Sequence, residues 1–102
     1  MAMDALLANK RTQIAAMCSR LGVRTLYAFG SAVRNDLKSG SDVDFLVEIQ
    51  SDDPLQYADR YFALKDQLQD LLQRPVDLVE AKAVRNPYFR QELERTRELI
   101  YG

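Results

Sequence analysis

Two aspartates, Asp42 and Asp44, are separated by one residue and introduce the apolar run 45–47. Side chains alternate across an extended strand, so both carboxylates lie on one face, with Cα atoms roughly 6.6 Å apart. Carboxylates at this spacing can converge on divalent ions about 3.5–4 Å apart. Upstream, Gly30 and Ser31 predict a tight turn whose backbone N–H groups suit a phosphate. A phosphate cradle beside a hard-metal site predicts phosphoryl or nucleotidyl transfer.

Three further features extend this hypothesis. Asp77 lies among apolar residues in the stretch 75–79, where a charge is costly unless it is paired or ligates a metal. A neighbouring strand can place it beside the aspartate pair, where it or a metal takes the proton from an attacking hydroxyl. Ser31 can offer its hydroxyl and N–H to a β- or γ-phosphate, because Gly30 has no Cβ to block the approach. Arg34, one turn further on, can reach a triphosphate with its bidentate fork.

Composition limits the metal and the partners. The chain has 102 residues, and we expect a single domain over 1–102 that buries roughly two-thirds of its surface. A net charge of −1 disfavours an obligate nucleic-acid partner. The absence of histidine removes the usual neutral-pH base and the usual zinc ligand, which favours Mg²⁺ or Mn²⁺ held by oxygen. With one cysteine, no signal-peptide pattern and no apolar stretch near twenty residues, we expect a cytoplasmic protein without membrane association.

The apolar periodicity predicts an α/β fold, a small mixed β-sheet backed by helices. Asp53 and Asn86, each followed by proline, are predicted helix caps. The predicted elements are a helix over 4–21, a strand over 24–29, a turn or short helix from Gly30 through Asp36 with Ser31 as its N-cap, a strand over 43–49, a helix over 54–72, a strand over 76–79, and a final helix from Pro87 with Phe89, Leu93 and Ile100 on one face.

These motifs carry a family resemblance. Gly30-Ser31-x-x-Arg34, Ser41-Asp42-x-Asp44 and the later strand aspartate resemble the DNA polymerase β-like nucleotidyltransferases. The short length, with Asn86-Pro87-Tyr88-Phe89 opening the last helix, resembles the minimal nucleotidyltransferase (MNT) subgroup over roughly residues 10–101. The resemblance implies the minimal form of the polymerase β-like fold.

The resemblance also implies roles for the candidate residues. Asp42 and Asp44 would hold two Mg²⁺ ions, and Asp77 would hold one ion and the attacking hydroxyl. Gly30 and Ser31 would bind the phosphates of ATP. Relatives of this kind are similar to antitoxins that transfer AMP from ATP to a tyrosine of a helical HEPN ribonuclease toxin. We expect a protein acceptor, since a short chain suits a substrate that brings its own binding surface.

Other interpretations stay open at this point. The chain can be a non-catalytic module that neutralises its partner by association, or a transferase for a small molecule or RNA end that needs a separate substrate-binding subunit. A homodimer, the preferred base and the acceptor residue also stay open. Arg34 can equally form a salt bridge to Asp36. Arginines of the last helix are expected on a solvated face, and four aromatic residues in the core or an interface. The arginines are Arg90, Arg95 and Arg97; the aromatic residues are Tyr57, Tyr61, Phe62 and Tyr88.

Overall fold

The computed structural model describes residues 5–33 and 42–102, so Arg34, Asp36 and Ser41 lie outside the described residues. Its elements follow one another as α1 (Ala5–Arg20), β1 (Val23–Phe29), the 3-10 turn η1 (Gly30–Ala32), β2 (Val43–Ile49), α2 (Pro54–Leu72), β3 (Val76–Glu80), the 3-10 turn η2 (Ala81–Ala83), α3 (Pro87–Thr96) and β4 (Glu98–Tyr101). This confirms the predicted α/β class and places the predicted strand over 43–49.

The strands form one mixed sheet in the order β3-β2-β1-β4. β1 runs antiparallel to both β2 and β4, whereas β2 and β3 are parallel and are connected through α2. Parallel neighbours start at the same edge of a sheet, so the first residues of β2 and β3 lie side by side. The register places Phe29 opposite Asp44, and Asp44 opposite Asp77.

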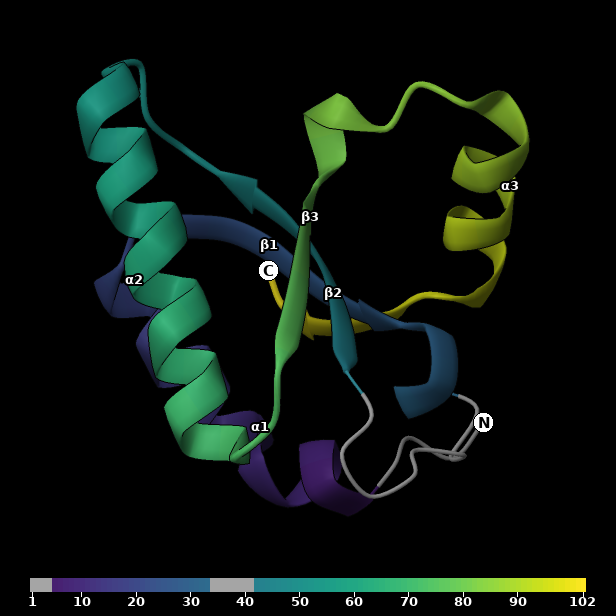
Figure 1. The fold of residues 1–102 in the computed structure, drawn as a ribbon, viewed down its shortest axis with the longest axis horizontal. Helices are drawn as coiled ribbons and strands as arrows, with labels where there is room; N and C mark the ends of the chain where they lie inside the picture. Colours follow the sequence, from purple (N-terminus) through teal and green to yellow (C-terminus); the bar gives the residue numbers. More distant parts are fainter. Residues whose placement is uncertain (1–4, 34–41) are drawn as a thin grey trace.

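One face of the sheet is covered by α1 and α2 (Figure 1). The side chains of β2 alternate between the two faces, and every second residue of that strand is buried in this core. α2 begins where the sequence predicts: Pro54 is in its first turn, and the Asp53 carboxylate accepts from the Leu55 N–H at 2.9 Å. The buried residues of β2 are Val43, Phe45, Val47 and Ile49, and they pack in one core with Ile14, Leu64 and Leu68 among others.

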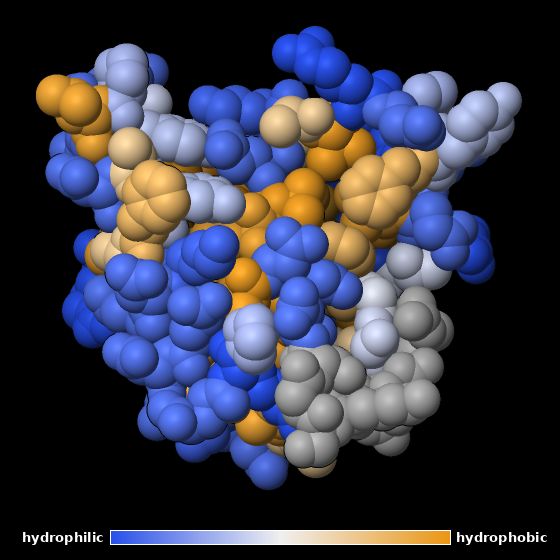
Figure 2. Space-filling model, viewed as in Figure 1, coloured by the Kyte–Doolittle hydropathy of each residue, from blue (hydrophilic) through white to orange (hydrophobic). Residues whose placement is uncertain are grey.

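The opposite face, which we call the carboxylate face, presents Asp44 and Leu46 of β2 together with Asp77 and Val79 of β3. Helix α3 covers only part of it, and a second, smaller apolar cluster forms there. Figure 2 shows apolar surface left in a hollow between α2 and α3. The cluster consists of Leu46, Val84 and Leu93, with Tyr27, Phe29, Val79 and Ala81 packed against it.

The predicted final helix is too long. α3 begins as expected, with the Asn86 side chain accepting from the N–H groups of Tyr88 and Phe89, but it ends at Thr96. Residues Glu98–Tyr101 form the strand β4, which pairs with the outer edge of β1 and buries Ile100 in the main core. A strand is favoured over a longer helix here because pairing satisfies the backbone groups of β1, which a continued helix would leave unpaired.

Side chains cap both edges of the sheet. On β3, Tyr61 donates its hydroxyl to the Leu78 carbonyl at 2.6 Å, and the Gln69 side chain accepts from the Val76 N–H at 3.1 Å. On β4, the Arg11 guanidinium donates to the Leu99 carbonyl.

Over residues 5–33 and 42–102, no helix has the length and apolarity needed to cross a bilayer.

Candidate active site

Gly30 brings the turn η1 into contact with β2. Its φ is +70°, in the left-handed region, and a Cβ added there would lie 2.7 Å from Asp44 Oδ2. Only glycine therefore lets the Asp44 carboxylate pack against this turn without strain. The turn closes through the Val33 N–H, which donates to the Gly30 carbonyl at 3.1 Å. A backbone turn in direct contact with a carboxylate joins the predicted phosphate cradle to the predicted metal site.

Ser31 lies within this turn and not at its cap. Phe29 occupies the N-cap position and makes no side-chain capping bond, so the predicted N-cap role of Ser31 is wrong for the described part of the segment. Ser31 is half-buried and lies, with Gly30, just beyond the end of β1. Its hydroxyl and N–H sit at the same edge of the sheet as Asp44, which suits the predicted contact with a phosphate.

Asp44 and Asp77 face each other across the parallel pair β2–β3. Neighbouring strands lie about 4.8 Å apart, so their two side chains emerge next to one another on the carboxylate face. Asp44 is half-buried and Asp77 is exposed, whereas Asp42 is exposed immediately before β2. Alternation carries Asp42 to the same face as Asp44. Exposure corrects the expectation that Asp77 bears a burial cost, since water hydrates its carboxylate.

The donor set fits a hard cation in its chemical type. Three carboxylates on one patch repel one another until a cation bridges them, and oxygen ligands are those that Mg²⁺ and Mn²⁺ prefer. Within residues 5–33 and 42–102, no three acidic, histidine or cysteine side chains are already converged on one point as a metal would require. Binding an ion would therefore need the exposed Asp42 and Asp77 side chains to turn toward Asp44.

Two tyrosines at the outer edge of β3 were not assigned to the site from the sequence. Tyr57 donates its hydroxyl to Glu80 Oε2 at 2.7 Å, and the Lys82 ammonium lies 4.0 Å from the Tyr57 ring centroid. Burial and the neighbouring Glu80 raise the pKa of Tyr57 above its usual range. The pKa of Tyr61 is raised by burial first, then by the charges of Glu80 and Asp77. Both phenols therefore stay protonated donors that hold β3 against α2.

Two of the three arginines expected on a solvated face have fixed partners on the carboxylate face. Arg90 Nη2 donates to the Val84 carbonyl at 2.6 Å, and the Arg97 guanidinium lies 4.1 Å from the Tyr27 ring centroid. Arg90 and Arg95 are nevertheless exposed, as expected, whereas Arg97 is half-buried, and Arg95 forms an exposed ion pair with Glu92 at 2.7 Å. Helical spacing does not predict these contacts, because Val84 lies six residues before Arg90 and outside α3, and Tyr27 lies on the distant strand β1.

The four aromatic residues also divide. Tyr57 and Tyr61 pack against the main core, as expected. Phe62 and Tyr88 are 60% and 81% exposed, so the core part of that expectation is wrong for them.

The predicted site residues that the structure describes lie close together. Gly30, Ser31, Asp42, Asp44 and Asp77 all lie at the end of the sheet where β1 ends and β2 and β3 begin.

Comparison with known proteins places the chain in a family. A model of the nucleotidyltransferase domain matches residues 10–100. A Methanocaldococcus jannaschii protein classed as a protein adenylyltransferase is 41% identical over 80 residues, which covers 78% of this chain and 76% of that relative. The protein adenylyltransferase MntA of Thermococcus cleftensis is 35% identical over 82 residues, covering 80% and 77% of the two chains.

Solved structures share the fold. A structure described as a minimal nucleotidyltransferase superposes with a TM-score of 0.70 at 28% identity, and the match covers 94% of this chain and 95% of the other. An MNT antitoxin from Shewanella oneidensis, in complex with a tri-AMPylated HEPN toxin, superposes with a TM-score of 0.63 at 18% identity, covering 93% and 71%. Because the domain model matches most of the chain and the minimal fold is shared, the chain belongs to the nucleotidyltransferase domain family, as an enzyme of its minimal form.

Proposed function

We propose that this chain is a Mg²⁺-dependent adenylyltransferase that moves AMP from ATP to the hydroxyl of a tyrosine in a partner HEPN toxin and thereby acts as its antitoxin. The observation that carries the proposal is the placement of Asp44 between the Gly30 turn and Asp77. The names of the relatives support AMP as the transferred group, and the Shewanella oneidensis complex supports a HEPN partner. The proposal assumes one domain and a cytoplasmic location, where ATP is available.

The residues divide the chemistry among them. In the proposed reaction, the acceptor oxygen bonds to the α-phosphorus while the bond to pyrophosphate breaks. The backbone N–H groups and hydroxyl at Gly30 and Ser31 bind the β- and γ-phosphates, and Arg34 adds a positively charged contact. Asp77 orients the acceptor hydroxyl and takes its proton. Asp42, Asp44 and Asp77 are the residues that would hold Mg²⁺, which when bound neutralises charge on the triphosphate.

The acceptor is proposed to come from outside this chain. Tyr57 and Tyr61, which lie beside β3, donate their hydroxyls to Glu80 and to the Leu78 carbonyl. Those bonds hold the phenolic oxygens against neighbouring protein atoms, and the raised pKa of each group opposes formation of a phenolate nucleophile. A partner's hydroxyl, in contrast, can approach the exposed Asp77 directly.

Transfer of label tests the proposal. The wild type, Asp42→Asn/Asp44→Asn and a control, Asp66→Asn/Asp70→Asn, are incubated with the HEPN partner, Mg²⁺ and ATP labelled in its α-phosphate. The control makes the same change of charge at two exposed positions of α2. We expect label on the partner with the wild type and the control, and at least a hundredfold less with the site variant.

Two outcomes would contradict the proposal. Equal neutralisation of the partner by all three proteins without any label would show a binding module. Label on RNA or a small molecule, and none on the partner, would show a different acceptor. Mapping of the labelled residue by mass spectrometry decides whether the acceptor is tyrosine.

A further inference from the structure

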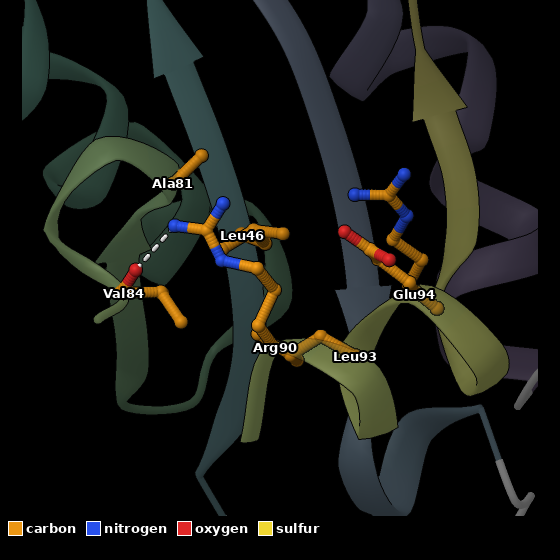
Figure 3. Close-up of a pocket in the computed structure, with 7 residues that line it drawn as sticks. Leu46, Ala81, Val84, Arg90, Leu93 and Glu94 are labelled. Carbon is orange, nitrogen blue, oxygen red and sulfur yellow. Dashed lines mark hydrogen bonds between the residues drawn. The ribbon is translucent and has the colours of Figure 1, made fainter. Parts of the chain in front are cut away.

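A cavity of about 100 Å³ opens on the carboxylate face between η2, β2 and α3 (Figure 3). It is lined by aliphatic side chains, by two arginines from α3 and the residue after it, and by Glu94. Apolar walls with a few polar groups are typical of pockets for small molecules. The aliphatic lining consists of Leu46, Ala81, Val84 and Leu93, and the guanidinium groups belong to Arg90 and Arg97.

The cavity lies directly along the strands from the candidate active site. Leu46 follows Asp44 by one alternation on the same face of β2, which is about 6.6 Å along the strand. Ala81 comes immediately after β3, the strand that carries Asp77. The cavity and the carboxylates therefore share one surface, and a ligand of moderate length can span both.

Both guanidinium groups are held in place. Arg90 is fixed by its bond to the Val84 carbonyl, drawn in Figure 3, and Arg97 by its contact with the Tyr27 ring. Neither forms an ion pair with any residue in the described part of the chain. A flat cation whose position is fixed and whose charge is not neutralised by a carboxylate is suited to stack on an aromatic ring system.

We propose that this cavity takes the nucleoside part of the nucleotide substrate, with the base between the aliphatic walls and the guanidinium groups. The inference rests on the proposed function and adds to it a place for the base. The attacking and leaving oxygens lie roughly in line through the phosphorus. With the outer phosphates at Gly30 and the acceptor at Asp77, that line crosses the strands from β1 through β2 to β3.

The nucleoside cannot lie on this line, because the outer phosphates occupy one end of the line and the acceptor occupies the other. The bond to the ribose leaves the phosphorus sideways, and along β2 the first side chain on the same face is Leu46, which lines the cavity. An engineered cavity of roughly 150 Å³ takes up benzene. A space of about 100 Å³ that is open to solvent therefore suits a base held partly inside. An aromatic side chain of the acceptor is the competing occupant, and the line of attack disfavours it.

Filling the cavity tests the inference. Ala81→Leu places a larger side chain in the cavity, and Ala83→Leu makes the same change at an exposed position of η2 that does not line it. Binding of two probes is measured by calorimetry with Mg²⁺: a non-hydrolysable ATP analogue and inorganic tripolyphosphate, which has no nucleoside. We expect Ala81→Leu to weaken the analogue at least tenfold and to leave tripolyphosphate unchanged, with Ala83→Leu behaving as the wild type.

A second variant, Arg97→Met, keeps the apolar stem without the guanidinium. It should weaken the analogue about tenfold more than tripolyphosphate, because only the analogue has a base on which the guanidinium can stack. Analogue binding unchanged in both variants, with a raised KM for the acceptor, would assign the cavity to the acceptor and overturn the inference. Equal weakening of both probes would overturn it too. If the wild type binds neither probe, the proposed function itself fails.

Discussion

At the scale of single residues, Gly30 is the position where backbone conformation and chemistry meet. Gly30→Ala places a Cβ in the left-handed region and 2.7 Å from Asp44 Oδ2. We expect a loss of about 1–2 kcal/mol in the free energy of unfolding and, because Asp44 must move, at least a hundredfold loss of AMP transfer. Denaturant unfolding and the label assay measure the two effects.

Gly22 provides the matched control for this prediction. Its φ is +69°, and a Cβ there would meet Arg60 Nη1 at 2.7 Å, at the end of a flexible side chain. Gly22→Ala should therefore lower the free energy of unfolding by a similar amount, about 1–2 kcal/mol, and leave AMP transfer unchanged. If both variants lose activity in proportion to their loss of stability, the contact between Gly30 and Asp44 has no chemical role.

Asp77 separates stability from function. It is exposed and lies opposite Asp44, and like charges directly opposite each other on neighbouring strands are destabilising. Without divalent metal, Asp77→Asn should leave the unfolding free energy unchanged or raise it by up to about 0.5 kcal/mol. Wild type should gain stability as Mg²⁺ is added, because an ion that binds only the folded state stabilises it.

Thermal unfolding with and without chelator measures this difference. We expect the Mg²⁺-dependent rise in Tm to be much smaller for Asp77→Asn than for the wild type, and AMP transfer to fall at least tenfold. An equal rise in Tm for both proteins would remove Asp77 from the metal site. Asp66→Asn, which lies on α2 away from this face, should respond to Mg²⁺ as the wild type does.

At the scale of elements, the hydroxyls of Tyr57 and Tyr61 hold the edge strand β3 against α2. Tyr57→Phe/Tyr61→Phe should cost about 1–3 kcal/mol, from two hydrogen bonds of which one involves a carboxylate. The folded-state pKa of both groups is raised. The unfolded chain therefore ionises first, so stability is complete below a pH of about 10 and falls as the pH rises above it.

Denaturant titrations between pH 8 and 11 check both parts of that prediction. The wild type should lose stability above about pH 10, and the double Phe variant should lose less over the same range. Tyr88→Phe is the control, since Tyr88 is 81% exposed and forms no part of this edge. Parallel slopes for the three proteins would show that the two hydroxyls have no linkage to folding.

The elements also show what sequence could and could not predict. β2 and both helix caps were predictable, because alternation and capping are local patterns. β4 was missed because Ile100 continues the helical spacing of Phe89 and Leu93, and its strand exists only through pairing with β1. The three aspartates could be predicted from their residue types, but the Asp44–Asp77 register depends on a parallel pairing between distant segments. The contacts of Arg90 and Arg97 follow no helical spacing, because Val84 precedes α3 and Tyr27 lies on β1.

At the scale of the whole molecule, the two faces of the sheet have different tasks. α1 and α2 bury one face in the main core, whereas α3 leaves part of the carboxylate face to solvent. The nucleotide proposed above would occupy that remaining surface, and a partner would cover it. A sheet with one face only partly covered depends on its edges being closed, since unpaired edges can join other chains.

Arg11 closes the β4 edge by donating to the Leu99 carbonyl, and its removal tests this dependence. Arg11→Ala should cost about 0.5–1.5 kcal/mol in unfolding free energy and increase self-association, because the freed carbonyl and the 39% exposed Leu99 become available to another strand. Sedimentation velocity over a range of concentrations measures the association, with Lys10→Ala as a control that removes the same charge one residue earlier. If the two variants associate equally, lost charge and not the open edge is responsible. If only Arg11→Ala associates, the edge bond keeps the β4 side of the sheet from pairing with another chain.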